Sequence, residues 1–127
     1  MIKDFEGWGT LKTQINIRKD APTFQQQEIW WCSIGVNIGN EEDGKSRLYS
    51  RPVLVVRKFN QYMFWGLPLT TKIKDNAFYH QIHFKDLQQS VMLSHLKLID
   101  SKRLTSKMGK LSDSQFEDIK TAIKKLI

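Results

Sequence analysis

The sequence predicts a mainly β domain: a small, partly open β-barrel with a C-terminal helix and an N-terminal helical arm. Short segments rich in β-branched and aromatic residues follow one another between residues 28 and 111. An apolar stripe with a helical repeat follows them, and a weaker one precedes them. Short strands in series beside one terminal helix are typical of a small barrel. We expect the arm over residues 1–22 and the barrel domain over residues 23–127.

Length and composition restrict the class of protein further. A chain of 127 residues with 40% apolar residues fits one folded domain with a modest core. No apolar run approaches the roughly 20 residues that span a bilayer, and the acidic first residues do not resemble a signal peptide. The single cysteine, Cys32, excludes an internal disulfide. We therefore expect a cytoplasmic protein with no membrane partner.

The charge balance is basic. Lys and Arg number 20 against 13 Asp and Glu, which gives a formal charge of +7. Such an excess favours polyanionic partners, among them RNA, DNA, an acidic protein or an anionic membrane. A solvated, slightly basic surface is the alternative interpretation.

The N-terminal elements are a helix, a strand and a long loop. The helix is expected over residues 4–18, with Asp4 as its N-cap and Pro22 beyond its end. The strand covers residues 28–34, which include two tryptophans. The segment from 35 to 50 contains three glycines and an acidic run, and loops of this length in small domains are usually functional or disordered.

The middle of the chain alternates strands and turns. Residues 51–57 and 63–70 are expected to form a hairpin around a turn at 59–62, and Pro68 indicates an edge or a bulge because it lacks an N–H donor. The further elements expected are strands at 78–84, 90–98 and 108–111, and a short helix at 101–107 capped by Asp100.

The C-terminal helix has the clearest pattern. Ser112 and Gln115 fit a capping box, with Gln three residues after Ser. One apolar stripe follows, and it consists of Phe116, Ile119, Ile123 and Leu126. Two lysines occupy the last turn, where positive charge complements the helix dipole.

Several kinds of catalytic or cofactor site are not indicated. The chain has no phosphate-binding glycine loop, no dinucleotide fingerprint and no nucleophile elbow. Its histidines are His80, His83 and His95, and the first two should point to opposite faces of one strand. No other metal ligand lies at suitable spacing, so no metal or cofactor is expected. Cys32, in the middle of a strand, is interpreted as a small buried residue and not as a nucleophile.

A possible phosphate site lies where two predicted strands meet. Hairpin geometry can bring Arg51, at the start of one strand, close to Thr70, at the end of the next. An arginine binds phosphate through two N–H groups, and a threonine hydroxyl can donate to a phosphoryl oxygen. The alternative is an ordinary arginine at a strand end and a threonine in a turn.

The order of motifs resembles the MazF/PemK toxins over about residues 27 to 127. The matching pieces are Glu28-Ile29-Trp30-Trp31, Gly35-Val36-Asn37-Ile38-Gly39, Arg51-Pro52-Val53-Leu54-Val55, Pro68-Leu69-Thr70-Thr71, Ser90-Val91-Met92-Leu93 and Leu98-Ile99-Asp100-Ser101-Lys102-Arg103-Leu104. The helix after Leu111 also fits.

The resemblance implies a fold and an activity. The fold is an SH3-like barrel that forms a homodimer. The activity is metal-independent cleavage of single-stranded RNA, such as mRNA, by a toxin whose partner is an acidic antitoxin. In this family the catalytic roles fall on an arginine at a strand start and a threonine at a strand end, which here are Arg51 and Thr70. The expected chemistry is attack by the RNA 2′-OH, which leaves a 2′,3′-cyclic phosphate.

The expected substrate contacts are Asn40, Glu41, Tyr49, Phe64 and Thr71. Glu41 is a possible base or else a solvated loop carboxylate, and the acidic run 41–43 can act as a gate over a basic groove. The aromatic residues are possible stacking platforms, together with Tyr62, or else core and hairpin packing residues. Two departures from the family bear on cleavage specificity: the loop before Arg51 is longer than usual, and Asn40 stands where serine is common.

Three alternatives remain open at this point. The first is a non-enzymatic toxin of the same fold that poisons DNA gyrase, because fold alone does not fix function. The second is an SH3-like binding module for nucleic acid or peptide, and the third is a family member that has lost its activity. The first two predict that Arg51→Ala leaves RNA turnover unchanged.

Overall fold

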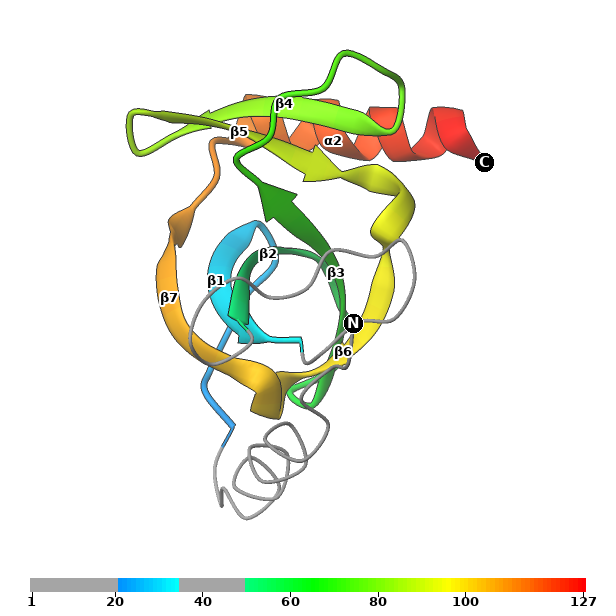
Figure 1. Ribbon diagram of the computed structural model, residues 1–127. Coiled ribbons are helices and arrows are strands. Elements are labelled where there is room, and N and C mark those ends of the chain that lie inside the picture. The colour runs from blue at the N-terminus through cyan, green and yellow to red at the C-terminus, as the bar shows by residue number, and fades with distance from the viewer. Residues whose placement is uncertain (1–20, 35–49) are drawn as a thin grey trace, which may run out of the picture.

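The computed structural model describes residues 21–34 and 50–127, and within them the chain is mainly β (Figure 1). Seven strands form one sheet in the order β4-β5-β3-β2-β1-β7, with β6 paired to β3. The strands are β1 (Glu28–Ser33), β2 (Ser50–Lys58), β3 (Met63–Thr70), β4 (Tyr79–Phe84), β5 (Leu87–Met92), β6 (Lys97–Asp100) and β7 (Leu104–Lys110). Two 3₁₀ turns, η1 (Leu93–His95) and η2 (Ser101–Arg103), flank β6, and helix α2 (Asp113–Leu126) ends the chain. The expected barrel with a C-terminal helix is confirmed.

The sheet curls into a half-barrel because β3 changes its partner along its length. Its first half pairs with β6 and its last two residues, Leu69 and Thr70, pair with β5, while β2 lies along its other edge. Pro68 lies between the two pairings, where a missing N–H donor is tolerated. The hairpin does have a bulge, but it lies on β2 between Val55 and Arg57 and not at Pro68, which pairs in register with Val53.

Two apolar clusters hold the layers together. One fills the inside of the curled sheet and contains Phe24, Trp30, Cys32, Val53, Val55, Phe64, Ile99 and Leu104. The other lies between the sheet, the β4–β5 hairpin and α2, and its members include Leu54, Leu69, Ile82, Val91, Phe116 and Ile119. The helix stripe is thus buried at Phe116 and Ile119, while Leu126 is exposed.

Gly66 sets how closely the sheet packs inside the first of these clusters. A Cβ atom at this position would lie 2.6 Å from Cγ1 of Val53 and 2.8 Å from Cδ1 of Ile99. These distances are shorter than real contacts, so a larger residue here would push the wall of the half-barrel outward.

The expected strand at 90–98 is wrong, because two strands occupy this region. β5 begins earlier, at Leu87, and forms a tight hairpin with β4 through Lys85 and Asp86, which both have positive φ. The chain then makes the turn η1 and continues as β6 on a different part of β3. Only two polar residues, Ser94 and His95, interrupt the apolar pattern between the strands, and neither is a Gly or Pro that would mark the turn.

The expected helix at 101–107 is reduced to the single turn η2. Its predicted cap is confirmed, since the Asp100 carboxylate accepts a hydrogen bond from the Lys102 backbone N–H at 2.9 Å. After Arg103 the chain becomes β7, which pairs with β1 and includes the expected strand residues 108–110. Pairing with β1 therefore outweighs the local helical preference.

Helix α2 begins as expected, with Ser112 as N-cap accepting from the Gln115 backbone N–H. The Gln115 side chain also holds the helix against β4. Its amide accepts from the His83 N–H at 2.8 Å and donates to the His83 carbonyl at 3.2 Å. The capping pair therefore also serves as a tertiary contact.

The N-terminal helix expected over 4–18 lies outside the described residues. Among the described residues, no helix combines the length and the apolar character needed to cross a membrane.

Candidate active site

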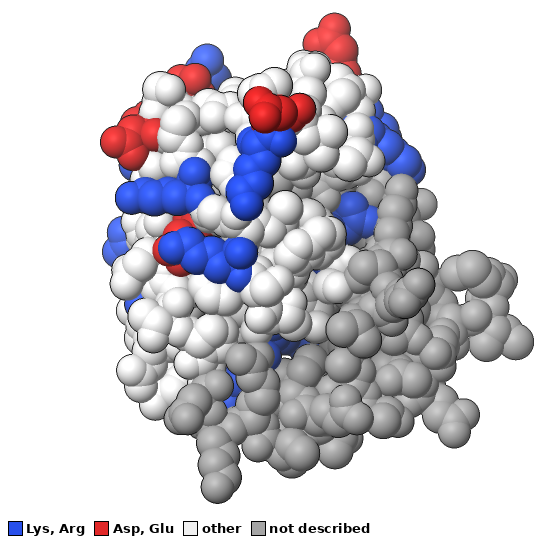
Figure 2. Space-filling view, turned by 90° about the vertical axis from the view of Figure 1, so that its left-hand side faces the viewer, with Lys and Arg blue, Asp and Glu red and all other residues white. Residues whose placement is uncertain are grey.

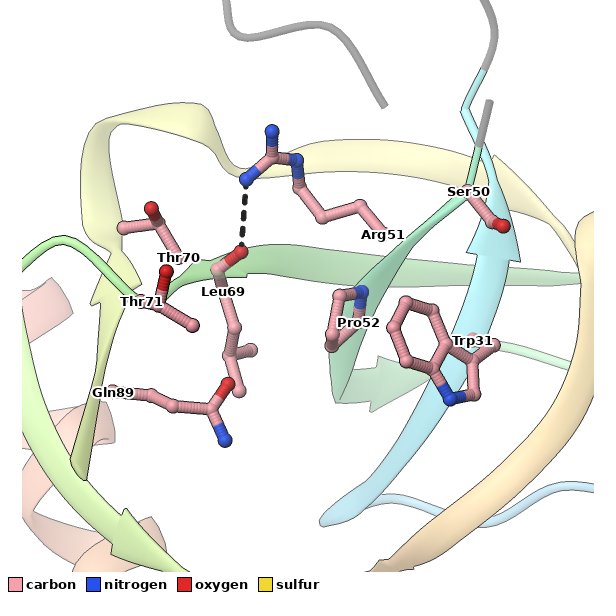
Figure 3. A pocket seen from close by; sticks show the side chains of 8 residues that line it. All are labelled: Trp31, Ser50, Arg51, Pro52, Leu69, Thr70, Thr71 and Gln89. Atoms are coloured by element: carbon pink, nitrogen blue, oxygen red, sulfur yellow. Dashed lines mark hydrogen bonds between the residues drawn. The ribbon is translucent and has the colours of Figure 1, made fainter. Parts of the chain in front are cut away.

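A pocket opens where β2 begins and β3 ends (Figure 3). Its volume is about 280 Å³, and the described residues that line it are Trp31, Ser50, Arg51, Pro52, Leu69, Thr70, Thr71 and Gln89. The paired register of the two strands ends at Val53 and Pro68, so two residues further on Arg51 and Thr70 lie on adjacent strand ends. The structure thus brings together the two residues on which the predicted chemistry depends.

Arg51 is held with its guanidinium at the mouth of this pocket. Only 4% of the residue is exposed, and Nη1 donates to the Leu69 carbonyl oxygen at 3.1 Å. Cross-strand pairing with Cys32 of β1 fixes its backbone. The guanidinium carries a positive charge, and the sheet sets the position of that charge.

Thr70 is also buried, and its hydroxyl is oriented by the chain that follows it. Its Oγ1 accepts a hydrogen bond from the Lys72 backbone N–H at 3.2 Å. Because the oxygen is accepting, the hydroxyl proton can be donated to another group. In Figure 3 the hydroxyls of Thr70 and Thr71 lie on the same side of the pocket, beside the Arg51 guanidinium.

The opposite half of the pocket is formed by residues that the sequence analysis did not select. Trp31, Pro52 and Leu69 supply apolar walls, and in Figure 3 the Gln89 carboxamide ends below the Leu69 side chain, across the pocket from Trp31. The sequence does carry a signal for Trp31 as a pocket residue, because it is an aromatic residue on the strand that pairs with the strand of Arg51. No sequence signal marks Gln89, because its position depends on the hairpin that the sequence analysis missed.

The remaining expected contacts fall in different places. Thr71 lines the pocket and is exposed, whereas Phe64 is fully buried and packs against Phe24 with ring centroids 5.1 Å apart. Phe64 therefore has the core-packing role that was its alternative. Tyr62 is 56% exposed and lies in the β2–β3 turn. Asn40, Glu41 and Tyr49, and with them the proposed acidic gate, lie outside the described residues.

In the described ranges, no group of three His, Cys, Asp or Glu residues is arranged to hold a metal ion. Cys32 is fully buried, as expected. Burial raises the pKa of its thiol to about 12, although the positive charges of Arg103 and Lys97 oppose the rise.

The basic charge is not gathered into one patch on the face beside β7. Figure 2 shows this face, where Lys and Arg side chains alternate with acidic and uncharged ones. On β7 itself, the Lys107 ammonium pairs with the Glu28 carboxylate at 2.7 Å. The excess of positive charge therefore does not by itself locate a polyanion on this face, and the pocket is the more specific indication.

Comparison with known proteins identifies the family. The model of the PemK-like, MazF-like toxin of type II toxin–antitoxin systems matches residues 25–127. The chain belongs to this family. No curated protein matches the sequence.

Solved structures of MazF toxins have the same fold. MazF from Deinococcus radiodurans superposes with a TM-score of 0.64 at 15% identity, over 83% of this chain and 96% of that one. An endoribonuclease in complex with its cognate antitoxin, from a Mycobacterial species, gives 0.62 at 15% identity over 81% and 93%. The Mycobacterium tuberculosis toxin MazF-mt6 gives 0.53 at 20% identity over 60% and 84%. At these identities the likeness shows a shared fold.

Proposed function

We propose that this MazF/PemK family member is the toxin of a toxin–antitoxin pair and acts as a cytoplasmic, metal-independent endoribonuclease on single-stranded RNA. The observation that carries the proposal is the pocket that both Arg51 and Thr70 line. A fixed guanidinium beside an oriented hydroxyl can hold a phosphodiester, since both groups donate to phosphoryl oxygens.

The proposed reaction uses the substrate's own nucleophile. The 2′-OH oxygen forms a bond to the adjacent phosphorus and the bond from phosphorus to the 5′-oxygen breaks, which leaves a 2′,3′-cyclic phosphate and a 5′-OH. The 2′-OH gives up its proton to a base, and the departing oxygen takes one up. Arg51 stabilises the charge that develops on the phosphoryl oxygens, and Thr70 orients the phosphate. Glu41 remains the candidate base.

The proposed partners follow from the family. The Mycobacterial structure contains an endoribonuclease with its cognate antitoxin, and two structures from Deinococcus radiodurans contain MazE with MazF. For this chain we propose an acidic antitoxin that covers the pocket at Arg51, and a homodimer as the active form. Asn40, Tyr49 and Thr71 are proposed substrate contacts beside the catalytic pair.

The test compares RNA cleavage by the wild type and by site variants in excess EDTA. Removal of one such donor typically lowers the rate about 10²–10³-fold. We expect this loss for Arg51→Lys, which keeps the charge but not the two-pronged donor, and for Thr70→Val, which keeps the shape but not the hydroxyl. Thr70→Ser should retain most of the activity.

The matched control is Arg57→Lys at the exposed other end of β2. It should leave cleavage unchanged, and thermal unfolding should show that all variants fold. Full activity of folded Arg51→Lys and Thr70→Val would refute the assignment of the site. Intact RNA with the wild type would refute the ribonuclease and favour a non-enzymatic toxin.

A further inference from the structure

The apolar half of the active-site pocket has no role in the chemistry proposed above. We propose that Trp31, Pro52, Leu69 and Gln89 bind one nucleobase of the RNA, next to the phosphate held by Arg51 and Thr70, and that the Gln89 amide selects which base is accepted. This inference rests on the proposed function and deepens it, because it assigns residues that determine cleavage specificity.

The shape of the half-pocket suits a flat ring. Its walls are the indole of Trp31, the ring of Pro52 and the side chain of Leu69 (Figure 3). At about 280 Å³ the whole pocket is near the lower end of the range for small-molecule sites, roughly 300–1,000 Å³. Bases of single-stranded RNA are bound by stacking on such aromatic surfaces.

Gln89 gives this largely apolar space a carboxamide, which carries both a donor and an acceptor. The residue is 4% exposed, and its carboxamide makes no hydrogen bond to any residue within 21–34 or 50–127. The amide reaches the open space of the pocket and is not sealed in the core, so a base that enters the pocket can use both its donor and its acceptor. Its neighbour Gln88 differs in both respects, because it is exposed and donates to the Gln81 amide at 2.6 Å.

The base pocket and the phosphate site share one stretch of β3. The Leu69 side chain lines the base pocket, its carbonyl accepts from Arg51, and the next residue is Thr70. A base and a phosphate of neighbouring nucleotides can therefore contact the same two residues. This continuity, together with the positive charge of Arg51, favours RNA over an apolar side chain of a protein as the occupant.

The chemistry of the amide predicts the kind of base. A carboxamide presents one donor and one acceptor, which matches an edge that offers both, such as the N6 amino group and a ring nitrogen of adenine. A carboxylate only accepts, so it would instead favour edges rich in donors, such as the N4 amino group of cytosine.

The test uses Gln89→Met and Gln89→Glu, with Gln88→Met and Gln88→Glu as matched controls on the opposite face of the same strand. One readout is the sequence at cut sites in a mixed-sequence RNA. The other is affinity for 2′-fluoro RNA octamers that differ at one base and cannot be cut. We expect Gln89→Met to lose a base preference of about tenfold at one position, and Gln89→Glu to shift it toward donor-rich bases. The Gln88 variants should keep the wild-type profile.

A second variant keeps the inference testable if the Gln89 variants do not fold. Trp31→Phe preserves an aromatic wall, so it should weaken octamer binding several-fold while the preferred base stays the same. If the wild type cuts RNA but the Gln89 variants keep its base profile, the inference is wrong while the proposed function stands, and an apolar side chain of a protein partner becomes the occupant to consider. If the wild type neither cuts nor binds RNA, both are wrong.

Discussion

Arg51 shows how a single residue can be both structural and reactive. Its charge is buried at a strand start, and one N–H is donated to the Leu69 carbonyl, which holds that end of the guanidinium against β3. A buried charge costs free energy of solvation, and a protein retains one where its position serves a purpose. Preorganised donors of this kind stabilise developing negative charge without reorganising during the reaction.

Cys32 lies one strand away from Arg51 and illustrates the opposite case. Its thiol is fully buried, and burial raises its pKa to about 12, so almost no thiolate exists at neutral pH. We expect folded protein at pH 8 to react with an aromatic disulfide reagent only as fast as it unfolds, and denatured protein to react at once. Rapid labelling under native conditions would show that the thiol is accessible and that this region opens.

At the scale of elements, the β4–β5 hairpin positions Gln89 and closes one side of the pocket. Its two-residue turn has φ of 52° at Lys85 and 60° at Asp86. This is the left-handed region, which favours Asn and Gly in hairpin turns and costs free energy for other residues. The fold accepts this local cost because the strands on both sides bury Ile82, Phe84 and Val91.

Replacement of Lys85-Asp86 by Asn-Gly should therefore stabilise the protein. We expect the free energy of unfolding to rise by about 1 kcal/mol, since the new residues adopt positive φ with less strain. Urea unfolding followed by tryptophan fluorescence measures the change. Gln61→Gly is the control, because Gln61 has no positive φ and the substitution should lower stability or leave it unchanged. A destabilised Asn-Gly variant would contradict this account of the turn.

The elements that the sequence predicted best are those whose local pattern and tertiary pairing agree. The strands β1 to β3 alternate or contain β-branched runs, and α2 combines a cap with an apolar stripe, so their limits were close to those observed. The turn at Lys85 has no Gly or Asn to mark it, which hid the start of β5.

The residues of the candidate site also differ in how far the sequence predicts their positions. Arg51 and Thr70 could be paired from strand ends, whereas Gln89 depends on a hairpin without a sequence signal.

At the scale of the whole molecule, Glu28 links the start of the barrel to its last strand. Its carboxylate accepts from Trp30 Nε1 at 3.0 Å and from the Gln25 backbone N–H at 2.8 Å, and pairs with Lys107 of β7. Partial burial acts to raise the pKa of Glu28, but these hydrogen bonds and the charge of Lys107 outweigh it and lower the pKa below its usual 4.5.

This lowered pKa predicts how stability depends on pH. The folded state favours the ionised carboxylate, so Glu28 stabilises the protein above pH 4.5, and this contribution is lost as the pH falls through the folded-state pKa. Glu28→Gln should lower the free energy of unfolding by about 1–2 kcal/mol at pH 7, a figure reduced because Lys107 is half exposed. The difference from wild type should shrink in acid.

Urea unfolding at a series of pH values between 7 and 3 measures this dependence. Glu117→Gln is the control, since Glu117 is exposed and pairs with Lys120 on its own helix, and it should change stability little. A difference between wild type and Glu28→Gln that stays constant over the whole range would show that the carboxylate is not the source of the stabilisation.

The central claim is that the pocket at Arg51 and Thr70 promotes attack by the RNA's own 2′-OH. The most direct test is to incubate the protein with an RNA oligonucleotide in excess EDTA, map the cut, and repeat with a substrate that lacks only the 2′-OH at that nucleotide. The account predicts a 2′,3′-cyclic phosphate and a 5′-OH from the first substrate, and no cleavage at that position of the second. Cleavage of the 2′-deoxy substrate at the same bond would contradict it, because the nucleophile would then have to be water or a group of the protein.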